Sequence, residues 1–125
     1  MILDTNAVSS LFTGDRALEK VLADEDRHQL PVIVVGEYAF GLQRSRGQRS
    51  LQQLLTRLIS ESDVLEIDLG TANYYAEIRR DLQQRGAPIP ENDLWIAALC
   101  LQHRRPLASR DQHFDRISRL ERTDW

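Results

Sequence analysis

The chain has 125 residues, of which 42% are hydrophobic and 28% charged, and its formal net charge is −3. This composition is typical of one globular domain, contains no run of ~20 apolar residues that would span a membrane, and lacks the basic balance of a general nucleic-acid binder. Cys100 is the only cysteine, which rules out an intramolecular disulfide and fits a reducing compartment.

The first residues are strand-like and do not form the basic segment plus apolar run of a secretory signal. We therefore expect a single domain over residues 1–125, located in the cytoplasm. Residues 1–4 predict a short strand, and residues 5–12 predict a helix. A second helix is expected around residues 18–22. The run "HQLPVIVV", residues 28–35, predicts a buried strand in which Pro31 restricts pairing to the later part.

Residues 37–42 lead into the next helix. In "LQQLLTRLIS", residues 51–60, the apolar residues recur at i, i+3, i+4, i+7 and i+8, which predicts an amphipathic helix. The alternation in "DVLEID", residues 63–68, predicts a third strand. Residues 71–85 predict a helix that Gly86 ends.

Two prolines precede the next helix, whose apolar face runs from Leu94 to Leu101 and which Pro106 ends. "PLASRD" predicts a very short fourth strand, and "RLERTDW" is the candidate for a last one. Strands separated by helices predict an α/β fold with a parallel sheet covered on both faces. In such sheets, ligands bind beyond the carboxyl ends of the strands, where the strand order reverses.

Four acidic residues are predicted to lie at that edge. Asp4 ends the first strand, Asp111 follows the fourth, Asp93 lies in the first turn of a helix, and Glu37 follows the second strand. Carboxylates brought together in one pocket repel one another, and a cation relieves the repulsion. Because all the donors are oxygens, and no histidine or cysteine spacing indicates zinc, Mg²⁺ or Mn²⁺ is the expected ion.

Each of these residues also has a structural explanation. Asp4 and Asp111 could cap helices, Asp93 could interact with a helix dipole, and Glu37 could be a solvated surface residue. The shared position of all four at one sheet edge favours the site.

Other polar groups are weaker candidates. His113 lies near Asp111, but a surface or packing role is the simpler interpretation. The loop "RSRGQR" carries three arginines that could bind a phosphate backbone or form a solvated turn. Cys100 lies between apolar neighbours on a helix, so we expect it in the core.

Four motifs, in order, resemble the PIN-domain family and, more closely, the VapC-type toxins of toxin–antitoxin pairs. They are "LDTN", "GEYAFGL", "PIPENDLWIAAL" and "LASRDQHF", and together they span essentially the whole chain. The resemblance implies a PIN-like three-layer α/β/α sandwich with a parallel four- to five-stranded sheet. It also implies an endoribonuclease that depends on Mg²⁺ or Mn²⁺.

The resemblance also implies roles for individual residues. The four acids of the family match Asp4, Glu37, Asp93 and Asp111. Of the polar residues that help to order such a site, the resemblance picks out three, which are Thr5, Asn6 and Ser109. Ser109 stands where threonine is common in the family and keeps the hydroxyl.

Partners are implied in the same way. Such toxins usually form homodimers and are inhibited by a small cognate antitoxin in a hetero-oligomer. They reach operator DNA only through the antitoxin, and their usual RNA targets are tRNA and rRNA, with mRNA as a further possibility. We expect no membrane partner.

Three other functions stay open from the sequence. A haloacid-dehalogenase-like phosphatase also begins with an Asp at the end of its first strand, but it needs a second Asp where this chain has Asn6. A PIN nuclease of RNA maturation would have the same acids. A module that binds RNA or antitoxin without cutting would have them too. An acidic cluster shows that a metal ion could bind, but it does not show that RNA is cleaved.

Overall fold

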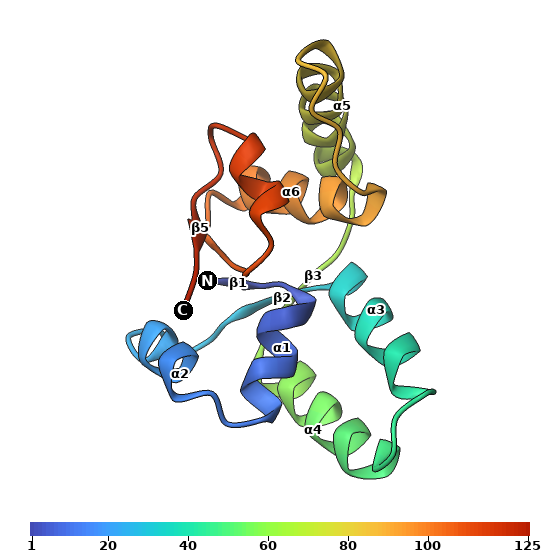
Figure 1. The fold of residues 1–125 in the computed structure, drawn as a ribbon, viewed down its shortest axis with the longest axis vertical. Helices are drawn as coiled ribbons and strands as arrows, with labels where there is room; N and C mark the ends of the chain where they lie inside the picture. Colours follow the sequence, from blue (N-terminus) through green and yellow to red (C-terminus); the bar gives the residue numbers. More distant parts are fainter.

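The computed structural model describes residues 1–125, and its centre is a five-stranded sheet (Figure 1). All the strand pairings are parallel, in the order β3-β2-β1-β4-β5. The strands are short, because each contributes only two or three paired residues: β1 (Ile2–Leu3), β2 (Gln29–Pro31), β3 (Asp63–Leu65), β4 (Leu107–Ala108) and β5 (Arg122–Thr123).

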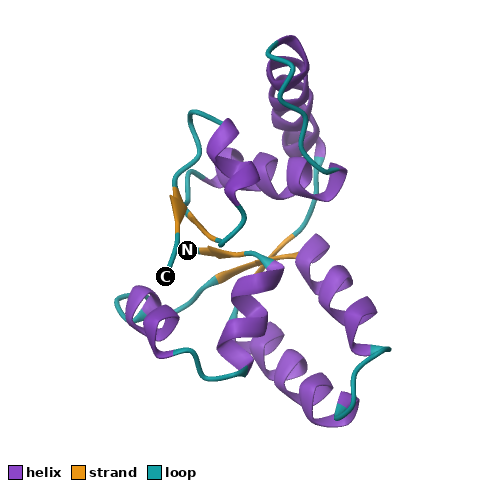
Figure 2. Ribbon diagram, viewed as in Figure 1, coloured by secondary structure: helices purple, strands orange, loops and turns teal.

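Helices cover both faces of this sheet, which gives three layers (Figure 2). The first four helices lie on one side, and the last two, with a short 3₁₀ helix, lie on the other (Figure 1). The helices are α1 (Thr5–Phe12), α2 (Arg16–Leu22), α3 (Val32–Leu42), α4 (Gln48–Glu61), α5 (Leu69–Gln84), α6 (Glu91–His103) and the 3₁₀ helix η1 (Gln112–Arg116). The predicted three-layer α/β/α architecture with a parallel sheet is confirmed. No helix has the length and apolar character needed to cross a membrane.

The core includes the strands, α6 on one side of the sheet and residues of α1, α2 and α3 on the other. Every residue of β1 and β4 is fully buried, as expected for parallel strands covered on both faces. Four consecutive residues of α6, from Ile96 to Leu99, are also fully buried. Cys100 is buried beside them, which confirms its predicted place in the core, and burial raises the pKa of its thiol. Since α6 is held on several sides, its first turn is a fixed platform for Asp93.

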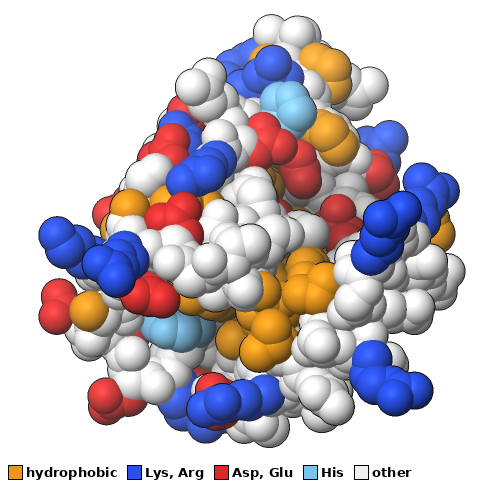
Figure 3. All heavy atoms as spheres, turned by 60° about the horizontal axis from the view of Figure 1, so that its bottom comes forward, with side chains coloured by type: hydrophobic (Ala, Val, Ile, Leu, Met, Phe, Trp, Pro, Cys, Tyr) orange, Lys and Arg blue, Asp and Glu red, His pale blue; other side chains and the backbone are white.

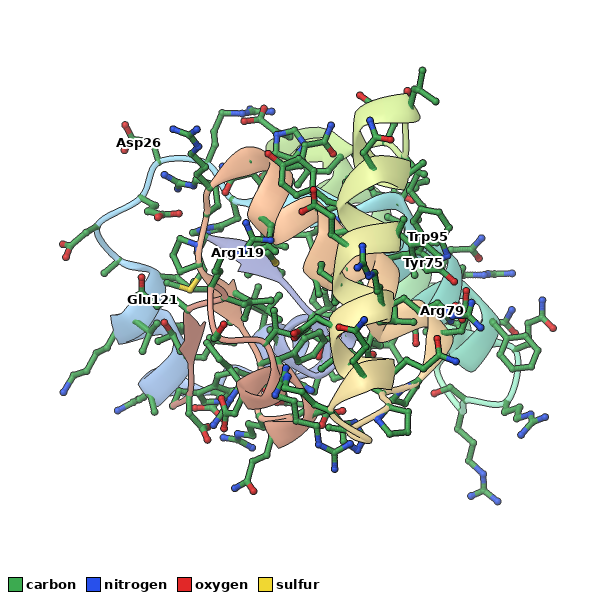
Figure 4. The ribbon with its side chains drawn as sticks, turned by 90° about the horizontal axis from the view of Figure 1, so that it is seen from above. Asp26, Tyr75, Arg79, Trp95, Arg119 and Glu121 are labelled. Carbon is green, nitrogen blue, oxygen red and sulfur yellow. The ribbon has the colours of Figure 1, made fainter.

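Helix α5 packs along α6 on the outer side of the molecule. Tyr75 of α5 stacks on Trp95 of α6 with ring centroids 4.0 Å apart and an interplanar angle of 16°. The guanidinium of Arg79 lies over the Tyr75 ring, 5.9 Å from its centroid. The three side chains lie together in Figure 4. These contacts fix α6 against α5 on the side away from the sheet.

The strand predicted over residues 28–35 is only partly correct. Strand β2 ends at Pro31, and residues 32–35 are the first turn of α3. Pairing therefore uses the part before and at Pro31, where the prediction put it after. The run "VIVV" favours a strand locally, but Val34 and Leu42 are buried on one face of a helix, and this tertiary packing outweighs the β propensity.

A buried hydroxyl connects the start of α5 to α6. Thr71 is fully buried, accepts a hydrogen bond from the Asp68 backbone N–H at 3.1 Å and donates to Gln102 Oε1 at 2.6 Å. Asp68 in turn accepts from the Thr71 backbone N–H, which completes a capping box.

We expect Thr71→Val to lower the free energy of unfolding by about 1–3 kcal/mol, because it leaves buried polar partners without their hydrogen bonds. Urea denaturation measures the change. Thr71→Ser keeps the hydroxyl and is the matched control, which should retain most of the stability. An unchanged stability of Thr71→Val, which keeps a methyl group and lacks the hydroxyl, would show that the hydrogen bonds of Thr71 do not contribute.

Candidate active site

The polar residues of interest surround the point where the strand order reverses. From β1 the chain moves to β2 and β3 on one side, whereas β4 and β5 lie on the other side of β1. Asp4 directly follows β1, and Ser109 directly follows β4. Because β1 and β4 are parallel neighbours, both residues emerge at the same edge of the sheet.

Asp4 is almost completely buried, with 5% of its surface exposed. Its carboxylate accepts hydrogen bonds from Ser109 Oγ at 2.6 Å, from the Thr5 backbone N–H at 2.8 Å and from Asn6 Nδ2 at 3.1 Å. Burial raises the pKa of Asp4 in spite of these donors, and Asp111 raises it further by charge repulsion. Asp4 therefore caps α1, as its structural explanation proposed, and also lies beside a second carboxylate.

Asn6 and Ser109 hold the loop after β4 against the start of α1. Asn6 Nδ2 lies 3.3 Å from Ser109 Oγ, and Asn6 Oδ1 accepts from the Arg110 backbone N–H at 3.1 Å. Ser109 Oγ also accepts from the Asp111 backbone N–H at 3.0 Å. The position of Asp111 relative to Asp4 is thus set by hydrogen bonds between two segments that are about a hundred residues apart in the chain.

Asp93 and Asp111 approach each other through His113. Asp93 lies in the first turn of α6, and Asp111 caps η1 by accepting from the His113 backbone N–H at 2.9 Å. The His113 Nδ1 atom is 2.9 Å from Asp111 Oδ1 and 3.4 Å from Asp93 Oδ2. One ligand atom from each of the three residues lies within 4.8 Å of the other two.

Glu37 reaches the site from the opposite layer. It lies in the second turn of α3 and not at the start of the helix, because residues 32–35 are already helical. Burial raises the pKa of Glu37, and charge repulsion from Asp4 raises it further. Its side chain also borders a cavity of about 250 Å³ between α1, α3 and α4, which Thr5 and Tyr38 help to line.

The electrostatics of this region fit a divalent cation. The pKa of Asp93 is raised to about 6, first by burial and then by Asp4 and Asp111. Buried polar atoms without a hydrogen-bond partner occur at five places in the chain, and three of these are Thr5 Oγ1, Glu37 Oε1 and His113 Nδ1. A bound divalent cation would relieve the repulsion between the crowded carboxylates and would give the unpartnered polar atoms a partner, directly or through its waters.

His113 is the residue whose place sequence reasoning missed. The simpler interpretation assigned it to the surface or to packing, whereas its ring touches two of the four predicted acids. A signal was present in "SRDQHF". When an Asp caps a short helix, its carboxylate accepts the backbone N–H of the residue two positions later, so that His113 is held beside Asp111. The arginines of "RSRGQR" lie in and just after the α3–α4 turn, where all three are exposed.

Comparisons with known proteins agree with this arrangement. The PIN domain family model matches residues 1–120. Ribonuclease VapC5 of Mycobacterium tuberculosis is 30% identical over 115 residues, which cover 90% of this chain and 84% of that protein. Ribonuclease VapC2 of Rickettsia felis is 27% identical over 107 residues, which cover 85% of this chain and 80% of that protein.

Several solved structures with the same fold are VapBC complexes. The VapBC2 complex of Rickettsia felis, bound to a DNA fragment from its promoter, aligns with a TM-score of 0.87 and 25% identity, covering 99% of this chain and 97% of that chain. VapBC-1 of nontypeable Haemophilus influenzae aligns with a TM-score of 0.87 and 26% identity, covering 99% and 96%. With the family model matching nearly its full length, this chain belongs to the PIN-domain family and, within it, is related to the VapC proteins.

Proposed function

We propose that the chain is a metal-dependent endoribonuclease that acts as the toxin of a toxin–antitoxin pair. The observation that carries this proposal is the convergence of Asp4, Asp93 and Asp111 on one sheet edge, with Glu37 beside Asp4, in a chain related to ribonucleases. The proposed substrate is the phosphodiester backbone of RNA, and the cytoplasm is the proposed location of the activity.

We propose Asp4, Glu37, Asp93 and Asp111 as the ligands of Mg²⁺ or Mn²⁺. Two of them, Asp93 and Asp111, offer carboxylate oxygens within 4.8 Å of each other. When bound, such an ion supplies a Lewis acid that polarises the scissile phosphate and favours ionisation of water. Asp4 is held in place by Ser109, Thr5 and Asn6, so it presents a fixed negative charge to the same region. The Glu37 Oε1 atom has no hydrogen-bond partner and is available to accept a hydrogen bond from water.

An antitoxin partner follows from the relatives, whose solved structures are VapBC complexes. We propose that the antitoxin docks on the side formed by α1, α3 and α4, where the cavity beside Glu37 lies and where Phe40 is 61% exposed. On the face in Figure 3, acidic side chains gather beside a histidine, and an apolar patch lies next to them. Homodimerisation, and contact with operator DNA only through the antitoxin, are part of the same proposal.

The experiment that tests this function is RNA cleavage by the purified chain. We expect endonucleolytic cuts in total RNA with Mg²⁺ or Mn²⁺, mapped by sequencing of the new 5′ and 3′ ends, and no cuts when a chelator is present. Adding a cognate antitoxin should suppress the cuts. Binding of RNA without any cleavage would favour a module that does not cut, and cleavage unaffected by chelator would contradict the metal centre.

A further inference from the structure

The imidazole of His113 has the position of a metal ligand. Its Nδ1 atom lies 2.9 Å from Asp111 Oδ1 and 3.4 Å from Asp93 Oδ2. Two ligand atoms that bind one ion at ~2.1 Å and at right angles lie ~3 Å apart, and opposite ligands lie ~4.2 Å apart. The two separations from His113 Nδ1 fall in this range, and one donor atom from each of the three residues lies within 4.8 Å of the other two.

These close approaches are not ordinary hydrogen bonds. His113 Nδ1 is buried and has no hydrogen-bond partner, although two carboxylate oxygens are near it. Asp111 Oδ1 already accepts the His113 backbone N–H at 2.9 Å. The ring nitrogen thus lies close to two carboxylates without a hydrogen-bond partner of its own, as a nitrogen that binds an ion would.

The backbone around His113 is held in place. The cap by Asp111 fixes its N–H, and the next residue, Phe114, is fully buried in the core. The Ile117 backbone N–H bonds to the Phe114 carbonyl at 3.1 Å and closes the short helix η1. The imidazole thus projects from an anchored segment, which is the arrangement that a ligand residue needs.

We propose that His113 is a nitrogen ligand of the metal centre and makes the site favour Mn²⁺ over Mg²⁺. This inference rests on the proposed function and refines its cofactor. Carboxylate and water ligands suit Mg²⁺ and Mn²⁺ alike, whereas imidazole suits transition metals. One nitrogen among the oxygens therefore shifts the preference toward Mn²⁺.

The opposite role would have the opposite effect. If a protonated His113 acted only as a counter-ion for Asp93 and Asp111, it would compete with any bound cation. Its removal would then strengthen the binding of both ions. As a ligand, its removal weakens Mn²⁺ binding and changes Mg²⁺ binding less.

The test is Mn²⁺ and Mg²⁺ titration calorimetry on the purified full chain and on His113→Ala. We expect the wild type to bind Mn²⁺ more tightly than Mg²⁺, and the variant to lose at least about tenfold in Mn²⁺ affinity. His103→Ala, which removes an exposed histidine at the end of α6, is the matched control and should leave both affinities unchanged.

Pulsed electron paramagnetic resonance of the Mn²⁺-loaded chain gives a second readout. Nitrogen-14 modulation from a coordinated imidazole should be present in the wild type and in His103→Ala, and absent in His113→Ala. Bound Mn²⁺ without this modulation, or tighter Mn²⁺ binding by His113→Ala, would overturn the inference and leave the proposed nuclease intact. A wild-type chain that binds neither ion would refute the metal centre itself.

Discussion

Asp93→Asn should abolish RNA cleavage while leaving the protein folded. Asparagine keeps the size of the side chain but lacks the charge that binds a divalent cation. In the wild type, the Asp93 carboxylate lies 3.4 Å from the His113 imidazole. We expect cleavage to fall by at least about 100-fold, more than the effect of removing a residue that only orients a ligand. Initial rates on a defined RNA measure the loss. Growth arrest on expression in bacterial cells should disappear in the same variant.

Two controls separate this effect from misfolding. The carboxylate of Asp93 is repelled by Asp4 and Asp111, so its neutralisation should leave the melting temperature of the metal-free protein equal to the wild type or higher. Asp81→Asn, an exposed carboxylate on α5, should keep full activity. Metal-dependent cleavage that persists in Asp93→Asn would reject the role assigned to this residue.

Divalent metal should raise the melting temperature of the wild-type chain. An ion that binds only the folded state stabilises it by ~1.4 kcal/mol at ten times its dissociation constant, which corresponds to about 5 °C for a domain of this size. Differential scanning calorimetry with Mg²⁺, Mn²⁺ and chelator measures the shift. Asp93→Asn should show a much smaller shift, because it lacks one of the proposed ligands.

The same shift should depend on pH. The pKa of Asp93 is about 6 in the folded chain and 3.8 as its ordinary value. Without metal, the neutral carboxyl contributes stability that is complete below pH 3.8 and is lost as the pH rises through about 6. Metal requires the ionised form, so the thermal shift should be largest above pH 6 and decline below it. A shift that is equally large at pH 5 and pH 8 would contradict this binding site.

Most elements of the fold could be predicted from local patterns. Helix α1 extends over Thr5–Phe12, as its apolar spacing indicates, and the amphipathic leucine pattern gave α4. The exception is the start of α3. A run of β-branched residues favours a strand by propensity, and only its contacts with other helices make it helical. Glu37 consequently lies in the second turn of α3 and not at the helix start, where the predicted strand over residues 28–35 placed it.

The acidic cluster was predictable for a different reason. Parallel strands joined by helices bring their carboxyl ends to one edge of the sheet. An Asp that follows β1 or β4 is therefore predicted to lie at that edge, near the other residues that follow strands. That argument applies to side chains at strand ends and helix starts. It says nothing about His113, whose ring meets Asp93 only because η1 folds back over the first turn of α6.

The amino-acid sequence alone determined the α/β class, the parallel sheet and the identity of the four candidate carboxylates, because periodicity and the order of elements are local properties of the chain. The tertiary structure decided where β2 gives way to α3, which hydrogen bonds hold Asp4, and that an imidazole joins the carboxylates. Each of these depends on contacts between residues that are distant in the chain, and local preferences do not encode the packing that brings them together.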